Sequence, residues 1–437
     1  MTRMLSTFAS VLVLVAAPDA FADTLTPVEP DKVGMSAERL QRLTDVFQEE
    51  IDEGRLPGAV VVVGRKGEIA YAESFGVRDP VNGGDDPMET DAIFRIYSMT
   101  KPLVSVAAMI LMEEGRLQLT DPVAKFLPAF EEPVVSTART DAYGKLSYVS
   151  LPAERAMTVQ DLLRHTAGLA YGELTGNPVV REAYAAAGAY QPDVLPFNAR
   201  DVSPEAQVEE LAKAPLIHQP GTAWEYSFAS DLLGRVVEAA SGQRLGDFLE
   251  ERLFAPLDMV DSGFHVPEDQ LGRLAEPFET DPASGLPNLL IEVSEPPAND
   301  SGGAGGVSTA RDYLRFSQMM LNGGELDGAR ILSPTTVRLM TSDHLGGRIE
   351  TPVTPGELLL GTPGYSFGLG FAVREGDGVA GVPGAKGEFM WAGYAGTYFW
   401  IDPEEELVGV LMTQAPSPAR AYYRRHMKQL VYQAIVE

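Results

Sequence analysis

The sequence predicts an α+β domain in which an antiparallel sheet, flanked by helices, is interrupted by a mainly helical insertion. Strand-like segments occur at both ends of the chain, near residues 59–75 and 367–413, and the middle is mostly helical in pattern. The 437 residues are 45% hydrophobic and 22% charged, which is ordinary globular composition with ample material for a core. Strands at both ends around a helical middle indicate one α+β unit with an insertion. We expect the α/β part to comprise residues 23–95 and 300–437, and the helical part residues 96–299.

The first 22 residues have the pattern of a secretory signal. Arg3 supplies a positive charge, residues 8–17 are apolar, and residues 20–22 (Ala-Phe-Ala) offer a cleavage site before Asp23. The apolar run is too short to span a bilayer, and no later segment is apolar for long enough. The sequence therefore predicts an exported protein, periplasmic or secreted, without a membrane span.

The composition excludes several classes of function. The chain has no cysteine, which removes thiol catalysis, disulfides and cysteine metal sites. Its 34 basic and 62 acidic residues give a net charge of −28, which argues against binding to nucleic acid or an anionic membrane. The five histidines show no metal-ligand spacing, so we expect neither a metal nor a cofactor. We expect His165 to be a hydrogen-bonded structural residue, since buried polar groups need partners.

The N-terminal elements follow from apolar spacing. Residues 35–53 predict an amphipathic helix with Ser36 as N-cap, because apolar residues recur at intervals of three and four. These apolar residues are Leu40, Leu43, Phe47 and Ile51. A β-branched run at 59–64, a polar turn and a second run at 69–75 predict a hairpin.

The remaining elements alternate between helical and extended patterns. Helices are expected at 157–164, 205–212, 231–240 and 420–436, and strands at 367–373, 388–392, 397–401 and 407–413. Gly-, Pro- and Ala-rich stretches at 131–156 and 173–203 predict long surface excursions. We expect them to wall a pocket, because long insertions in compact domains often serve as lids.

Ser98 and Lys101 are the first candidate catalytic pair. Positions i and i+3 share one face of a helix, so the hydroxyl and the amine can project into one pocket. Pro102 suits the first turn of a helix, and residues 104–114 are apolar on nearly all sides, which predicts a buried helix. A buried lysine can become neutral and remove the serine proton. The Ser-x-x-Lys pattern occurs about once per chain by chance, so its value depends on the rest of the site.

Two further segments could complete such a site. Tyr226, within residues 220–228, could carry a proton to and from the serine; the alternative is a core tyrosine beside Trp224. Residues 391–397 are rich in small side chains, which lets backbone N–H groups form an oxyanion hole with that of Ser98. The alternative there is an ordinary glycine-rich hairpin. The glycine-rich residues 301–306 lack the context of a phosphate loop and predict a backbone turn beside a pocket.

Four segments together resemble the serine β-lactamase-like hydrolases, which include class C β-lactamases, DD-peptidases and, most similar, the family VIII carboxylesterases. They are FRIYSMTKP at 94–102, LLRHTAGL at 162–169, PGTAWEY at 220–226 and GGVSTARD at 305–312. The chain has no G-x-S-x-G elbow, which argues against an α/β-hydrolase. The resemblance implies a β-lactamase/transpeptidase-like fold.

The resemblance also implies roles for individual residues. Ser98 would be the acylated nucleophile, Lys101 its base and Tyr226 the second proton carrier. The segment that replaces the Lys-Thr-Gly of β-lactamases resembles the Trp-Gly-Gly of the esterases. It comprises Trp391, Ala392 and Gly393, followed by Tyr394, whose backbone N–H would complete the oxyanion hole.

Two departures from the β-lactamase pattern bear on the substrate. Phe228 stands where class C enzymes have the asparagine of Tyr-x-Asn, and Trp391 stands where they have the lysine that meets a carboxylate. Both changes favour a neutral or apolar acyl substrate over a penicillin. A β-lactamase or D-amino-acid peptidase acting on amides, and a non-catalytic binding protein on the same fold, are the alternatives.

Overall fold

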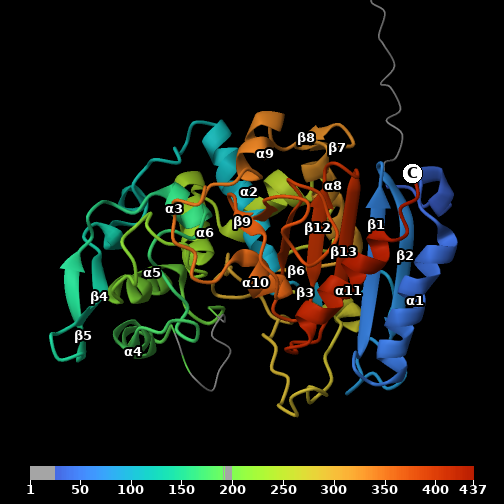
Figure 1. Ribbon diagram of the computed structural model, residues 1–437, viewed down its shortest axis with the longest axis horizontal. Helices are drawn as coiled ribbons and strands as arrows, with labels where there is room; N and C mark the ends of the chain where they lie inside the picture. The colour runs from blue at the N-terminus through green and yellow to red at the C-terminus, as the bar shows by residue number, and fades with distance from the viewer. Residues whose placement is uncertain (1–24, 190, 192–198) are drawn as a thin grey trace, which may run out of the picture.

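A seven-stranded antiparallel sheet forms one half of the molecule (Figure 1). The computed structural model describes residues 25–189, 191 and 199–437, so the predicted signal at 1–22 lies outside the described residues. The strand order is β2-β1-β13-β12-β11-β10-β9. The strands are β1 (Gly58–Arg65), β2 (Glu68–Gly76), β9 (Tyr365–Phe367), β10 (Ala372–Arg374), β11 (Phe389–Ala392), β12 (Tyr398–Asp402) and β13 (Leu407–Thr413).

The first and last strands of the chain are neighbours in this sheet. β1 pairs with β13 in antiparallel register, with Val61 opposite Leu411. Every residue of β1 is buried, as expected for a run of valines covered on both faces. The prediction of one sheet built from both ends of the chain is confirmed.

Helices cover both faces of the sheet. α1 (Ala37–Asp52) packs on β2 and on α11 (Arg420–Tyr432), and α8 (Ala310–Leu321) packs on β1, β12 and β13 (Figure 1). α1 begins as predicted, since the Ser36 hydroxyl accepts the Arg39 N–H. The hydrophobic face of α1 is then directed into the core.

A mainly helical part lies beside the sheet, with α2 (Thr100–Glu113) at its centre against α6 (Ala229–Ser241). Residues 100–111 of α2 are all buried, which confirms the predicted buried helix. The helix begins before residue 104, because Lys101 and Pro102 already belong to its first turn. The shorter helices are α3 (Val159–Leu163), α4 (Pro178–Ala186), α5 (Pro204–Lys213), α7 (Leu245–Leu249), α9 (Pro334–Met340) and α10 (Pro355–Leu360).

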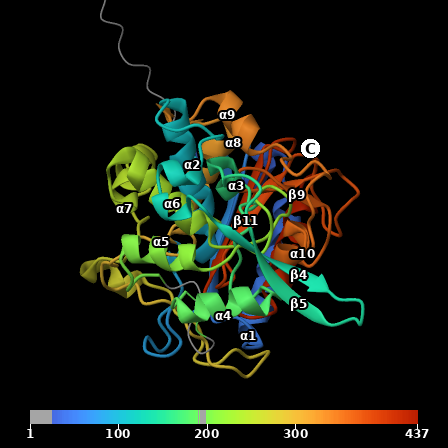
Figure 2. The ribbon, with the colours of Figure 1, turned by 90° about the vertical axis from the view of Figure 1, so that its left-hand side faces the viewer.

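The segment at 131–156, predicted as a long surface excursion, contains regular structure. This segment forms a hairpin of β4 (Val134–Thr140) and β5 (Leu146–Pro152), which projects from the helical part (Figure 2). Its turn is stabilised by the Asp141 carboxylate, which accepts two backbone N–H groups. The strands contain valine, threonine and tyrosine, residue types that favour extended structure. Within the described part of the chain, no helix is long and apolar enough to cross a membrane.

Candidate active site

Ser98 lies in a short 3-10 turn (Tyr97–Met99) between strand β3 (Phe94–Arg95) and α2. β3 pairs with β6 (Val307–Ser308), and the Ile96 N–H donates to the Gly306 carbonyl at 3.0 Å. These contacts tie the turn to the glycine-rich segment that was predicted beside a pocket.

The backbone just before Ser98 is held in an unfavourable conformation. Tyr97 has a φ of 44°, which is rare for a bulky residue. Its hydroxyl accepts the Ile291 N–H at 2.9 Å, its ring packs edge-on against Tyr394, and its carbonyl accepts from the Thr100 hydroxyl at 2.6 Å. Conformations of this kind persist only where the surroundings determine them, and they cluster at functional sites.

Ser98, Lys101 and Tyr226 meet around one oxygen atom. Lys101 Nζ lies 3.0 Å from Ser98 Oγ, and the Tyr226 hydroxyl donates to the same Oγ at 2.6 Å. Ser98 lies in the 3-10 turn that leads into α2 and Lys101 in the first turn of α2, whereas Tyr226 precedes α6, the helix that packs on α2. Lys101 is 1% exposed, so its amine is shielded from solvent.

The glycine-rich segment supports the amine of Lys101. Lys101 Nζ donates to the Gly303 carbonyl at 2.6 Å. The Gly303 N–H in turn donates to Asp231, which also accepts from the Ser301 hydroxyl. A Cβ at Gly303 would lie 2.2 Å from Asp231 Oδ2, so only glycine fits there. The segment is a turn beside the pocket, as predicted.

Aromatic rings fix the position of Tyr226. Its ring centroid lies 5.5 Å from that of Trp391, 5.3 Å from that of His165 and 5.2 Å from that of Tyr171. Lys101 Nζ lies 4.8 Å from its centroid, within cation–π range. The hydroxyl of Tyr226 is therefore directed at Ser98 by packing on several sides.

His165 is one of these packing residues. It is buried, and its Nδ1 lies 3.2 Å from the Ser227 hydroxyl. Burial and the nearby charge of Lys101 hold its pKa well below the usual range, which keeps the ring neutral. The structure thus places it in the structural position that the sequence indicated.

The end of β11 forms the opposite wall of the site. Ala392, Gly393 and Tyr394 line the same pocket as Ser98. The Gly393 N–H closes the β11–β12 turn by donating to the Thr397 carbonyl at 2.8 Å. A Cβ at Gly393 would lie 2.4 Å from the Ile96 carbonyl oxygen, so this glycine allows the strand to approach the Ser98 turn closely.

Trp391 is not at the pocket surface, which corrects its place among the expected substrate-binding residues. Its side chain is 0% exposed and packs against Tyr226 and Phe367. Successive side chains of a strand point to opposite faces, so when Ala392 faces the pocket Trp391 faces the interior. Trp391 acts on the site through the position of Tyr226.

The pocket has a volume of about 330 Å³. Its lining comprises Ser98, Glu173, Leu174, Tyr226, Leu358, Leu359, Ala392, Gly393, Tyr394, Arg420 and Arg424. Among the described residues of the excursion at 173–203, only Glu173 and Leu174 belong to this lining, and the hairpin of β4 and β5 contributes none.

Sequence reasoning missed the charged side chains of this pocket, because no motif includes them. Both carboxylate oxygens of Glu173 are buried without a hydrogen-bond partner, and burial raises its pKa to about 7 against the opposing effect of Lys101. Arg424 is fully buried and donates to the carbonyls of Leu359 and Gly393. Burial lowers the pKa of Arg424 to about 9. Arg424 therefore stabilises the β11–β12 turn.

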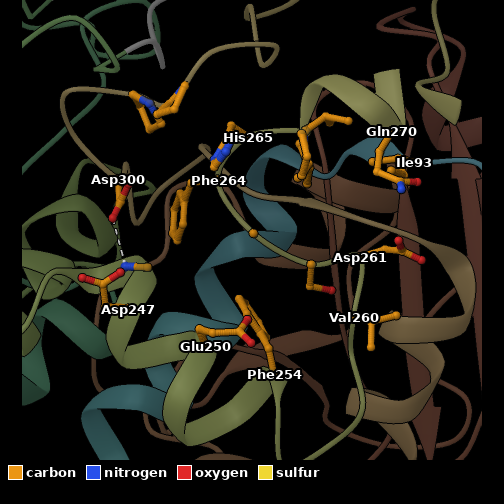
Figure 3. Close-up of a pocket in the computed structure, with 18 of the residues that line it drawn as sticks. Ile93, Asp247, Glu250, Phe254, Val260, Asp261, Phe264, His265, Gln270 and Asp300 are labelled. Atoms are coloured by element: carbon orange, nitrogen blue, oxygen red, sulfur yellow. Dashed lines mark hydrogen bonds between the residues drawn. The ribbon is translucent and has the colours of Figure 1, made fainter. Parts of the chain in front are cut away.

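A larger cavity of about 540 Å³ lies elsewhere and contains none of the Ser98, Lys101 and Tyr226 side chains (Figure 3). Asp300, in its wall, accepts from Arg244 and from the Gly246 N–H, so this carboxylate is already satisfied. Over the described ranges, no group of three His, Asp or Glu residues could hold a metal ion. The chemistry of the molecule is concentrated at Ser98.

Comparison with known proteins identifies the family and the fold. A family model described as Beta-lactamase matches residues 43–433. Protein Rv1367c of Mycobacterium tuberculosis is 37% identical over 84% of this chain and 88% of its own length. Esterase EstB of Burkholderia gladioli is 32% identical over 89% of this chain and 94% of its own. The solved structure of EstCE1, a hydrolase with promiscuous acyltransferase activity, superposes with a TM-score of 0.72 at 29% identity, covering 90% of this chain and 99% of that one.

The chain belongs to the beta-lactamase family, and its fold is the β-lactamase/transpeptidase-like fold. Within that family it is a serine hydrolase of the esterase type.

Proposed function

We propose that the protein cleaves small carboxylic esters through an acyl-enzyme formed on Ser98. The observation that carries this proposal is the convergence of two proton-carrying groups on one hydroxyl, at 3.0 Å from Lys101 Nζ and 2.6 Å from the Tyr226 oxygen. Nucleophile and base within hydrogen-bond reach, with the base oriented by a third group, define an activated serine. The carbonyl of Gly303 orients the amine.

In the acylation step, Ser98 Oγ attacks the ester carbonyl carbon while its proton passes to the amine of Lys101, which acts as the base. That amine can keep one N–H on the Gly303 carbonyl and turn its lone pair toward Ser98. The negative charge on the carbonyl oxygen is then expected to face the backbone N–H groups of Ser98 and Tyr394. When the tetrahedral intermediate collapses, the Tyr226 hydroxyl protonates the departing alkoxide and recovers a proton from Lys101.

Deacylation uses the same groups in reverse. Water gives a proton to the Tyr226–Lys101 pair as its oxygen attacks the acyl carbon, and the pair returns a proton to Ser98 Oγ as the acid leaves. An alcohol in place of water would give acyl transfer, the second activity in the description of EstCE1.

Part of the pocket lining is apolar, which suits the acyl chain of a small ester. Leu174, Leu358 and Leu359 supply apolar wall, and a volume of about 330 Å³ suits a small molecule. Esterase EstB, at 32% identity, acts on esters by name. We expect hydrolysis of p-nitrophenyl butyrate to exceed turnover of nitrocefin and of D-Ala-D-Ala substrates.

The test is ester hydrolysis by purified wild-type protein and a Ser98→Ala variant. We expect the variant to lose nearly all p-nitrophenyl butyrate hydrolysis and all labelling by an active-site fluorophosphonate. Retained hydrolysis would refute the role of Ser98, and a clear preference for nitrocefin or the dipeptide would replace the esterase by a β-lactamase or a peptidase. A folded wild-type protein that is never labelled would support a binding role.

We also propose that the protein is exported, on the strength of the signal-like pattern at 1–22. Fractionation of the source cells should recover the protein outside the cytoplasm, with a mature N-terminus at Asp23. Recovery of the full chain in the cytoplasm would contradict export.

A further inference from the structure

Arg420 places a half-buried guanidinium in the pocket that holds Ser98. It is the first residue of α11, and it also lines a neighbouring groove of about 340 Å³ that shares Tyr394 with the pocket. Its guanidinium lies 5.3 Å from the centroid of the Tyr394 ring and donates to the Tyr394 carbonyl at 3.4 Å. The side chain is thus held against one wall with its charge beside the substrate space.

No carboxylate of the described residues lies within ion-pair distance of Arg420. The protein has 62 acidic residues, and Arg95, a buried arginine, is paired with Glu276 at 2.9 Å. Arg420 is half-buried, and burial lowers its pKa, but a guanidinium keeps its charge at neutral pH. A dehydrated charge without a counter-ion is unfavourable unless a ligand supplies one.

The acidic groups near Arg420 do not fill this role. Glu173 lines the same pocket, but its carboxylate oxygens accept no hydrogen bond and make no ion pair with Arg420. Asp281 lines the neighbouring groove, where its carboxylate accepts from the Ser284 hydroxyl and backbone. Arg424, one turn further along α11, differs because its two terminal nitrogens donate to three backbone carbonyls, and only its Nε has no partner.

We propose that Arg420 binds a carboxylate of the substrate, and that the preferred substrates are esters carrying one free carboxylate group. A planar guanidinium meets a carboxylate through two parallel hydrogen bonds, and stacking on Tyr394 fixes the plane of that fork. In the β-lactamase pattern a lysine stands where this chain has Trp391 on β11. Here Arg420 supplies a cation from α11 instead. Glu173 in the same pocket disfavours a substrate that carries two carboxylate groups. This inference rests on the proposed ester hydrolysis and names its substrate class.

Two pairs of esters test the inference and locate the carboxylate. The first pair compares p-nitrophenyl hemiglutarate, which carries a carboxylate on the acyl side, with uncharged p-nitrophenyl valerate. The second pair compares 4-acetoxybenzoate, which carries a carboxylate on the alcohol side, with its methyl ester. Hydrogen bonds to charged groups contribute about 1.5–3 kcal/mol, so we expect kcat/KM to favour the carboxylate member of one pair by about 10- to 100-fold. The difference should reside mainly in KM.

Arg420→Gln should abolish this preference, and Arg420→Lys should retain part of it, because a lysine keeps the charge but not the fork. The matched control is Arg139→Gln, which removes an exposed arginine from the β4–β5 hairpin with the same change of net charge. It should leave the preference at the wild-type value. An equal kcat/KM for both members of both pairs in the wild type, or an unchanged ratio in Arg420→Gln, would overturn the inference.

Binding without turnover separates this inference from the proposed function. Calorimetry of monomethyl glutarate with the Ser98→Ala variant should show binding that weakens at least about tenfold when Arg420→Gln is added. Equal affinity with and without Arg420 overturns the carboxylate site whatever the enzyme hydrolyses. Arg420-dependent binding by a wild-type protein that hydrolyses no ester would refute the proposed reaction instead.

Discussion

Removal of the Tyr226 hydroxyl should cost catalysis far more than stability. Tyr226→Phe deletes the donor that lies 2.6 Å from Ser98 Oγ and keeps the ring among Trp391, His165 and Tyr171. A positioned acid–base group contributes about 10²- to 10⁴-fold to rate, which corresponds to about 2.7–5.4 kcal/mol of transition-state stabilisation. The hydrogen bond itself contributes only about 1 kcal/mol to folding. We therefore expect a large loss of kcat and a small change in the melting temperature.

The assay is p-nitrophenyl butyrate hydrolysis, with thermal unfolding followed by circular dichroism on the same preparations. The matched control is Tyr398→Phe, which removes a buried hydroxyl whose partner is Met390 Sδ at 3.4 Å. The control should keep wild-type kcat. If Tyr226→Phe retains kcat within about threefold of the wild type, which is under 1 kcal/mol, the proton path does not pass through Tyr226. Lys101 would then be the sole proton carrier.

Three further variants test other parts of the structure. The native carboxyl of Glu173 keeps its proton up to about pH 7, whereas an ordinary glutamate loses it near pH 4.5. The contribution of Glu173 to wild-type stability should therefore fall as the pH rises between these values. Glu173→Gln should have a higher melting temperature than the wild type at pH 8 and a similar one at pH 4. Gly393→Ala forces a Cβ to within 2.4 Å of the Ile96 carbonyl oxygen, so it should lower the free energy of unfolding in urea by about 1–3 kcal/mol and also lower kcat. An unchanged unfolding free energy would show that β11 can move to make room for the methyl group. Lys428→Met removes the amine that lies 2.5 Å from the buried carboxylate of Glu388, and this should lower the free energy of unfolding by about 3–5 kcal/mol. A Lys428→Met/Glu388→Gln double variant should recover most of that stability. No recovery would mean that lost packing, not an unpaired charge, is the cause.

The sequence was informative wherever local spacing determines contact. Ser98 and Lys101 meet because residues three apart share a helix face, and α1 begins at Ser36 because a cap needs only its own first turn. Tyr226 could be placed beside them only through the resemblance to a family. Its contact with Ser98 depends on the packing of α6 on α2, which no local pattern specifies.

The charges of the pocket could not be predicted for the same physical reason. Glu173 and Arg420 are 247 positions apart in the chain, and neither belongs to a motif, so only the tertiary fold brings them to one cavity. Trp391 was misplaced because the resemblance aligns its position in the chain but does not say which face of the strand its side chain takes. The expectation of a neutral or apolar substrate, drawn from Phe228 and Trp391, did not include Arg420, which α11 brings to the same pocket.

The position of Ile96 explains how the nucleophile and the β11 edge remain in register. Its N–H donates to the Gly306 carbonyl, and its own carbonyl accepts from the Thr397 hydroxyl at 3.4 Å. The glycine-rich turn that supports Lys101 and the β11–β12 turn therefore both hold Ile96, one through its N–H and the other through its carbonyl. Gly393 has no space for a Cβ beside the Ile96 carbonyl oxygen, so the β11 edge lies directly against the turn that carries Ser98. Catalysis by aligned dipoles needs donors that do not reorganise during the reaction, and two turns fixed to one residue beside the nucleophile favour that arrangement.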